Sequence, residues 1–345
     1  MVIIMAQRLG VGTVELGKKP RIVSNAAVVG SKEGDGPLAK HFDEIFQDIT
    51  MGEDSWEKAE SLLLKNAVKK ALQKSNTNKD DVHAIFSGDL LNQCMGSSFG
   101  LRDFEIPFGG LFGACSTMAL SLLMASLAIE TGGFDCAIAA TSSHFCSAEK
   151  QFRYPLEYGG QRTPTSQWTV TGSGAAVLKN CNTTTDPYID MVHLGTIRDL
   201  NITDANNMGA AMAPATAKTI SDFLSDTNTN ASDYDMILTG DLGFVGSELL
   251  KQLLMRENHI DISSVHNDCG MLIFNRDEQD VHAGGSGCGC SASVLCSYIL
   301  NSMRNGKYNK VLFVATGALM SSVSSLQGES IPGIAHAILI KGGQA

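Results

Sequence analysis

Residues 85–90 read Ile-Phe-Ser-Gly-Asp-Leu, and residues 237–242 read Ile-Leu-Thr-Gly-Asp-Leu. Each segment is a short apolar run that ends in a glycine and a carboxylate, which is typical of a buried strand followed by a turn. Because the same pattern occurs in both parts of a 345-residue chain, it indicates an internal repeat. A repeat of this kind predicts two related halves, so it decides the fold class.

Three further pairs of segments match in the same order along the chain. The pairs are 113–116 with 288–291, 139–141 with 314–316, and 175–179 with 337–341. Cys115 and Cys290 are 175 residues apart, and so are Thr141 and Thr316. Insertions and deletions therefore fall between the matched segments, which supports a duplication.

The predicted elements fit an α/β chain. Patterns of apolar residues predict strands over 21–31 and 82–89, and helices over 41–49, 54–74 and 116–129. We therefore predict two similar α/β halves, 1–185 and 186–345, packed around a pseudo-twofold axis, with helices on both faces of mixed sheets.

The composition excludes several classes of protein. With 43% hydrophobic and 18% charged residues the chain can bury a large core, and a net charge of −10 without a basic run argues against a nucleic-acid partner. Nine cysteines without Cys-x-x-Cys pairs predict a reducing, cytoplasm-like compartment. The longest nearly apolar stretch, 118–129, is shorter than the roughly 20 residues of a membrane span, and no secretory signal pattern is evident, so we expect membrane contact only through partners.

Cys115 is the first candidate for a functional residue. It follows a glycine-rich approach and opens an apolar helix, which is the geometry of a nucleophile elbow. The helix N-terminus is expected to lower the pKa of its thiol below about 8.5, although a buried structural cysteine is the alternative. Because sites in open α/β sheets lie beyond the carboxyl ends of strands, we expect Asp89, Cys115, Asp241 and Ser286 to converge.

These features resemble the thiolase superfamily, in particular its ketoacyl synthase III-like branch, over essentially the full chain. Residues 171–178, Thr-Gly-Ser-Gly-Ala-Ala-Val-Leu, are similar to the strand that closes the first half in that branch. The resemblance implies that a His and an Asn, or two His, join the cysteine, and the matching positions here are Gly240 and Ser286. Neither residue acts as a base near neutral pH, and loss of general acid–base assistance costs about 10²–10⁴-fold in rate.

Three histidines could replace the missing groups. They are His144, His266 and His282, of which His144 is best placed because it directly follows a predicted strand. The alternative is that each is a surface or structural imidazole.

Residues 142–170 form a predicted cap. Within them the loop 149–165 collects Lys150, Arg153 and Arg162 with two tyrosines, which favours an electropositive, aromatic cover over a small flat anion. An inter-subunit loop is the alternative, since the thiolase resemblance implies a homodimer that pairs through the strand preceding this segment.

Together with 87–91 and 282–291, this segment resembles a thiolase-like sporulation family of spore-forming bacteria. That resemblance implies a non-catalytic protein that binds dipicolinic acid (pyridine-2,6-dicarboxylate), alone or as its calcium chelate, and takes part in its uptake into the developing spore. It also implies membrane proteins as partners, a place at the cytoplasmic face of the spore inner membrane, and no cofactor beyond the calcium of the chelate.

The ligand-binding residues expected from this resemblance and from the pattern are Asp89, Cys115, Ser116, His144, Arg153, Arg162, Gly240 and Ser286. One alternative is an active acyltransferase or condensing enzyme in which His144 or His282 serves Cys115 as the nucleophile. Another is a scaffold for a membrane complex, which would have no affinity for the ligand.

Overall fold

The computed structural model describes residues 6–152, 162–183 and 185–343. Its main sheet runs in the order β12-β11-β14-β15-β10-β3-β9-β7-β5-β6. The strands from the first half of the chain are β3 (Arg21–Val29), β5 (Ala84–Gly88), β6 (Phe108–Gly110), β7 (Cys136–Ser143) and β9 (Gly172–Lys179). The strands from the second half are β10 (Tyr188–His193), β11 (Met236–Thr239), β12 (His266–Asp268), β14 (Lys310–Ala318) and β15 (Gly333–Lys341).

The two sets of five strands repeat one topology. In the first set β6, β5 and β7 are parallel, and β9 and then β3 continue the set in antiparallel pairing. In the second set β12, β11 and β14 are parallel, and β15 and β10 follow in antiparallel pairing. The sets adjoin where Tyr188 pairs with Arg21. The predicted duplicated α/β fold is therefore confirmed.

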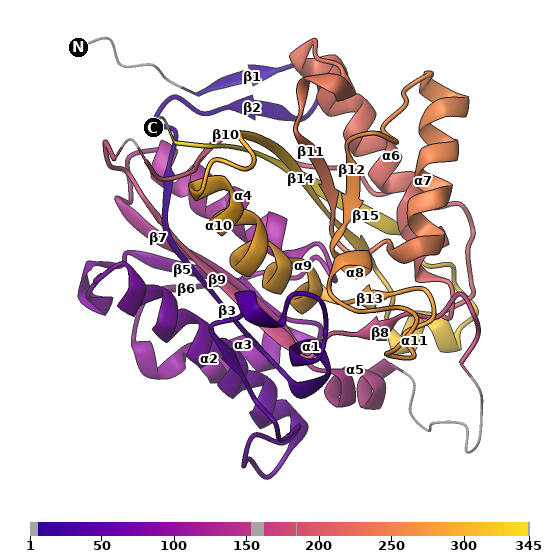
Figure 1. Cartoon of the computed structure of the whole chain (residues 1–345), viewed down its shortest axis with the longest axis horizontal. Helices are drawn as coiled ribbons and strands as arrows, with labels where there is room; N and C mark the ends of the chain where they lie inside the picture. The colour runs from indigo at the N-terminus through magenta and orange to yellow at the C-terminus, as the bar shows by residue number, and fades with distance from the viewer. Residues whose placement is uncertain (1–5, 153–161, 184, 344–345) are drawn as a thin grey trace.

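Helices form layers around these strands (Figure 1). α4 (Thr117–Glu130) and α9 (Cys288–Val294), which continues through a π turn into α10 (Leu300–Arg304), lie between the two sets. α2 (Trp56–Lys74) covers the outer face of the first set together with α3 (Met95–Leu101). α6 (Met208–Thr227) and α7 (Gly243–Asn258) cover the second.

The burial of each helix follows from its sequence. α4 is apolar on nearly all sides, which is typical of a helix packed within the core, and Met118 and Leu122 on it are fully buried in one cluster with Phe313. α2 instead buries one stripe, including Leu63 and Ala67, and exposes lysines on its other face. Its N-cap is Ser55, whose side chain accepts from the Lys58 backbone N–H.

Short elements complete the chain. They are β1 (Gln7–Leu9), β2 (Thr13–Glu15), α1 (Ser31–Gly34), β4 (Glu44–Ile45), α5 (Phe145–Phe152), β8 (Trp168–Thr169), α8 (Cys269–Leu272), β13 (Gly285–Ser286) and α11 (Ser322–Leu326). Among the residues described, no helix has both the length and the apolar character needed to cross a membrane.

Two predictions about local structure are wrong. The helix expected over 41–49 is instead the short strand β4, because backbone groups of Asp43 and Phe46 hydrogen-bond to β3. Part of the loop expected over 149–165 is helical, since α5 extends to Phe152.

The strand that precedes the cap segment does not offer a dimer edge. This strand is β7, which is buried throughout and pairs with β5 on one side and β9 on the other. The predicted pairing of two copies through it is therefore wrong. The edge of the first set is β6, where Phe108 is exposed.

Candidate functional site

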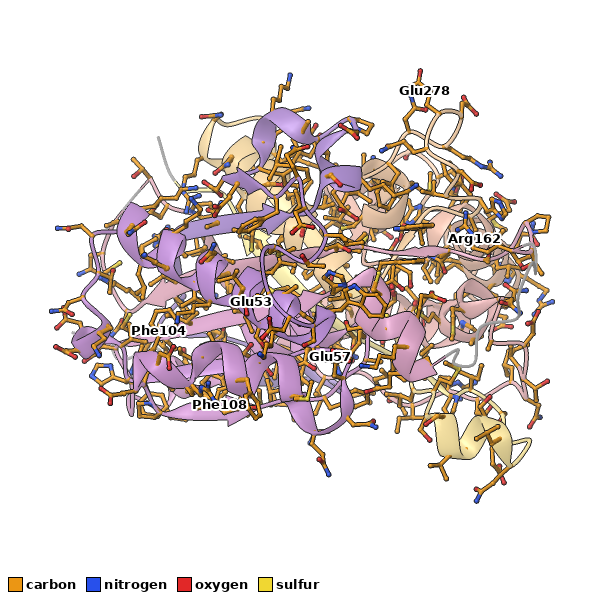
Figure 2. The ribbon with its side chains drawn as sticks, turned by 90° about the horizontal axis from the view of Figure 1, so that it is seen from below. Glu53, Glu57, Phe104, Phe108, Arg162 and Glu278 are labelled. Atoms are coloured by element: carbon orange, nitrogen blue, oxygen red, sulfur yellow. The ribbon has the colours of Figure 1, made fainter. Side chains whose placement is uncertain are left out.

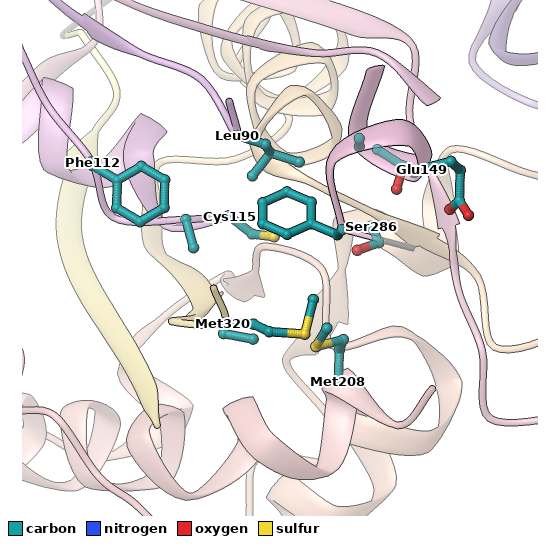
Figure 3. A pocket seen from close by; sticks show the side chains of 12 residues that line it. Leu90, Phe112, Cys115, Glu149, Met208, Ser286 and Met320 are labelled. Carbon is teal, nitrogen blue, oxygen red and sulfur yellow. The ribbon is translucent and has the colours of Figure 1, made fainter. Parts of the chain in front are cut away.

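A cavity of about 60 Å³ lies beside Cys115, and both halves of the chain contribute to it (Figure 3). Most of its wall is apolar, and the groups that can form hydrogen bonds include the Cys115 thiol and the hydroxyls of Thr169 and Ser286. The residues that line it are Leu90, Phe112, Ala114, Cys115, Ala148, Glu149, Phe152, Thr169, Met208, Ser286, Ala318 and Met320.

The backbone before α4 directs Cys115 toward this cavity. Ala114 has a left-handed conformation with φ +50°, which is uncommon for a residue with a side chain. The turn is held by Ser116, whose hydroxyl donates to the Gly113 carbonyl at 2.6 Å, and by Thr117, whose hydroxyl donates to the Ala114 carbonyl at 2.6 Å. Strain of this kind, fixed by local hydrogen bonds, is common at functional sites.

A buried carboxylate lies close to the Cys115 thiol. Asp241, which is fully buried just beyond the end of β11, accepts hydrogen bonds from the Thr316 hydroxyl at 2.6 Å and from the Gly287 N–H at 2.8 Å. The Ser286 hydroxyl donates to the same carboxylate at 3.4 Å. Burial raises the pKa of Asp241 to about 6, although these hydrogen bonds oppose the rise.

The same surroundings keep Cys115 protonated. Burial and the neighbouring Asp241 charge raise the pKa of its thiol well above the ordinary value. The expectation that a helix N-terminus lowers this pKa is wrong, because removal from water and a like charge outweigh the roughly 0.3–1 kcal/mol that a helix end provides. Cys115 is thus a thiol and not a thiolate at neutral pH.

Gly240 does not line the cavity. A Cβ atom at this position would lie 2.9 Å from the Thr316 backbone nitrogen, so the packing of β11 against β14 leaves no room for a side chain. The residue that reaches the thiol is its neighbour Asp241. The sequence placed Asp241 near the site, but it did not identify it as the partner of Cys115, although a carboxylate directly after a strand is the signal that could have done so.

The three candidate histidines are held elsewhere. In His144, Nε2 lies 2.8 Å from the Ile49 carbonyl and Nδ1 accepts from the Cys146 N–H, and burial lowers its pKa. His266 Nε2 lies 3.0 Å from the Thr239 hydroxyl. His282 lies between the Thr163 carbonyl and Asp280. Among the described residues, no imidazole lines the cavity.

Asp89 belongs to a separate buried cluster. It accepts hydrogen bonds from the Leu91 N–H and from both the N–H and the hydroxyl of Ser97. It lies close to Glu60, another fully buried carboxyl, and burial raises the pKa of both groups. The structure therefore brings Cys115, Asp241 and Ser286 together at the cavity, but not Asp89. Ser116 is fully buried and faces its own turn.

The basic residues of the cap do not line the cavity where the structure describes them. Arg162 forms an ion pair of 3.1 Å with Asp280 and stacks on Trp168, toward the other end of the molecule from Phe108 (Figure 2). Lys150 pairs with Glu57 at 2.6 Å. Arg153 lies outside the described residues, and its predicted role stays a prediction.

Known proteins resemble this chain in sequence, and others resemble it in fold. A family model described as stage V sporulation protein AD matches residues 10–341. Stage V sporulation protein AD of Bacillus subtilis (strain 168) is 47% identical over 323 residues, which cover 93% of this chain and 94% of the relative.

Solved structures share the fold at low identity. The 3-oxoacyl-[acyl-carrier-protein] synthase III of Aquifex aeolicus VF5 superposes with a TM-score of 0.57 at 11% identity, over 93% of this chain and 99% of that chain. The human mitochondrial 3-ketoacyl-CoA thiolase in complex with CoA gives a TM-score of 0.57 at 11% identity, over 99% and 100% of the two chains. The fold is thus thiolase-like, and the chain belongs to the stage V sporulation protein AD family.

Proposed function

We propose that the protein binds dipicolinic acid in the cavity beside Cys115 without transforming it, and that it takes part in the uptake of this ligand into the developing spore. The observation that carries the proposal is the setting of Cys115: its thiol lies close to the buried carboxylate of Asp241, and no imidazole among the described residues lines the cavity. A nucleophilic cysteine needs a base or a lowered pKa, and here the pKa is raised. The choice of ligand comes from the family resemblance.

The apolar part of the cavity wall suits a flat aromatic ring. The side chains of Leu90, Met208 and Met320 offer apolar surface to the faces of a pyridine ring, and the hydroxyls of Thr169 and Ser286 can donate to carboxylate oxygens. The cavity volume is about 60 Å³. A cavity that holds a benzene ring measures about 150 Å³, so binding requires the lining side chains to move apart. Methionines on two elements allow such movement, because their unbranched side chains adapt at low energetic cost.

Assembly and location have their own grounds. Exposed Phe99, Phe108 and Phe112 lie on or near the edge strand β6, which supports a homodimer formed at this edge. Contact with the spore inner membrane through membrane proteins of the same complex follows from the family alone.

Isothermal titration with dipicolinate, with and without calcium, tests the proposal. We expect saturable binding of a single ligand per chain, and the comparison shows whether the free acid or its chelate is the form bound. The Cys115→Ala variant should retain affinity within about tenfold, because the S–H group is a weak donor and contributes at most one hydrogen bond to the ligand. Absence of heat with both forms of the ligand would refute the proposal and favour a scaffold.

A further inference from the structure

A fully buried carboxylate, that of Asp241, lies directly behind the polar groups of the cavity. Cys115 and Ser286 both line the cavity, the Cys115 thiol lies close to Asp241, and the Ser286 hydroxyl donates to it at 3.4 Å. The Gly287 N–H and the Thr316 hydroxyl complete the hydrogen bonds of this carboxylate. A ligand carboxylate that contacts the Cys115 thiol and the Ser286 hydroxyl would therefore be separated from Asp241 only by these two groups. It would compete with Asp241 for their hydrogens.

No cation offsets this charge among the described residues. The hydrogen-bond and ion-pair partners of Asp241 in the described chain include no Lys, Arg or His. The titratable groups that face it are Asp268 from β12, Cys115 before α4, Cys269 on α8, and Cys288 and Cys290 on α9. Burial raises the pKa of these four thiols well above the ordinary value, so they carry no charge near neutral pH.

Asp268 is the other acid near the site, and its geometry differs. Its carboxylate accepts from the Leu242 and Gly243 N–H groups and from the Thr239 hydroxyl, and it does not line the cavity. Burial raises the pKa of Asp268 to about 7. It therefore serves as a matched buried acid that lacks contact with the cavity donors.

We propose that Asp241 takes up one proton from solvent when an anionic carboxylate ligand enters the cavity, so that this residue sets which pH range permits binding. The proposal rests on the proposed function. Protonation of Asp241 removes its own repulsion of the ligand carboxylate and leaves the hydrogens of Cys115 and Ser286 to turn toward the ligand. Asp241 acts as a positioning residue, since it works through these two donors.

The sign of the pH dependence follows from linkage. Burial raises the pKa of Asp241 to about 6 in the free protein, and an anion nearby raises it further. Affinity is then constant below pH 6 and falls as pH rises from 6 toward the higher pKa of the complex, by about tenfold per pH unit when one proton is linked. Binding in this range takes up close to one proton.

Calorimetric titration of calcium-free dipicolinate tests this inference. Titrations at several pH values between 6 and 8.5, each in two buffers with different ionisation enthalpies, give the affinity and the number of protons taken up. We expect close to one proton for the wild type and none for Asp241→Asn, with an affinity that no longer changes with pH. Asp268→Asn should keep the proton uptake of the wild type.

A second variant gives a result even if Asp241→Asn fails to fold. Thr316→Val removes the strongest hydrogen bond that opposes the raised pKa of Asp241, so the fall in affinity should begin at higher pH. Wild-type binding without proton uptake would overturn the inference, and so would uptake that persists in Asp241→Asn or disappears only in Asp268→Asn. Absence of any binding across the pH range would instead refute the proposed function.

Discussion

Replacement of Ala318 by phenylalanine should nearly abolish dipicolinate binding. Ala318 ends β14 and lines the cavity beside Cys115, where its side chain is 8% exposed. A phenyl ring at this position would fill the available 60 Å³, and forcing a ligand into a filled site costs about 1–3 kcal/mol or more. That energy lowers affinity by about 5- to 160-fold or more. Calorimetric titration measures the loss.

The matched control for this variant is Val323→Phe. Val323 lies on α11, is 64% exposed and does not line the cavity, so the same added bulk should leave affinity unchanged. Thermal unfolding of both variants separates loss of the site from loss of the fold. An Ala318→Phe protein that folds and binds with wild-type affinity would show that the ligand occupies another place.

The free energy of unfolding should fall as pH rises from 6.5 to 8. Below this range the buried imidazoles of His266 and His336, whose pKa burial lowers to about 4, have the opposite effect, because they lose stability as pH falls. Burial raises the pKa of Glu33 to about 7, of Asp241 to about 6 and of Asp268 to about 7, and it also raises those of Glu60 and Asp89. In the unfolded chain these carboxyls release their protons near pH 4, whereas the folded chain retains them to higher pH. The stability they provide is complete below the unfolded pKa and is lost as pH rises toward the folded values.

The expected loss between pH 6.5 and 8 is on the order of 1–3 kcal/mol, because each unit of pKa difference corresponds to about 1.4 kcal/mol. Melting temperatures recorded in steps between pH 6.5 and 8 measure it. Glu33→Gln should flatten the profile, since one Glu33 oxygen accepts from the Thr171 N–H and the other has no hydrogen-bond partner among the described residues. A melting temperature that is constant or rises over this range would contradict the prediction.

Sequence patterns predicted the fold well because the duplication can be recognised from short, continuous segments. Segments such as 85–90 and 237–242 carry their strand, glycine and carboxylate together, and each half repeats the same order of strands. The helix expected over 41–49 failed for the opposite reason. Its apolar spacing is compatible with a helix, but tertiary pairing of Asp43 and Phe46 with β3 determines its structure.

The candidate site was predicted only in part. Cys115, in its Gly-Ala-Cys turn, and Ser286 could both be identified from short motifs, and both residues line the cavity. Cys115 and Asp241 come from the two halves of the chain, so their proximity depends on tertiary packing, and the carboxylate directly after a strand was the one sequence signal for it. Met208 and Met320 were missed as lining residues, because methionines at these positions are equally compatible with ordinary core packing.

The central claim is that Cys115 remains as a protonated thiol beside a carboxylate, in a pocket that holds its ligand without acting on it. Incubation of the whole protein with an acyl-CoA, followed by intact-mass measurement and an assay of free CoA release, tests it most directly, with Cys115→Ala as the control. We predict no acyl adduct on Cys115 and no release above the Cys115→Ala background. Turnover of acyl-CoA through a Cys115 adduct, lost in Cys115→Ala, would contradict this account and establish an acyltransferase.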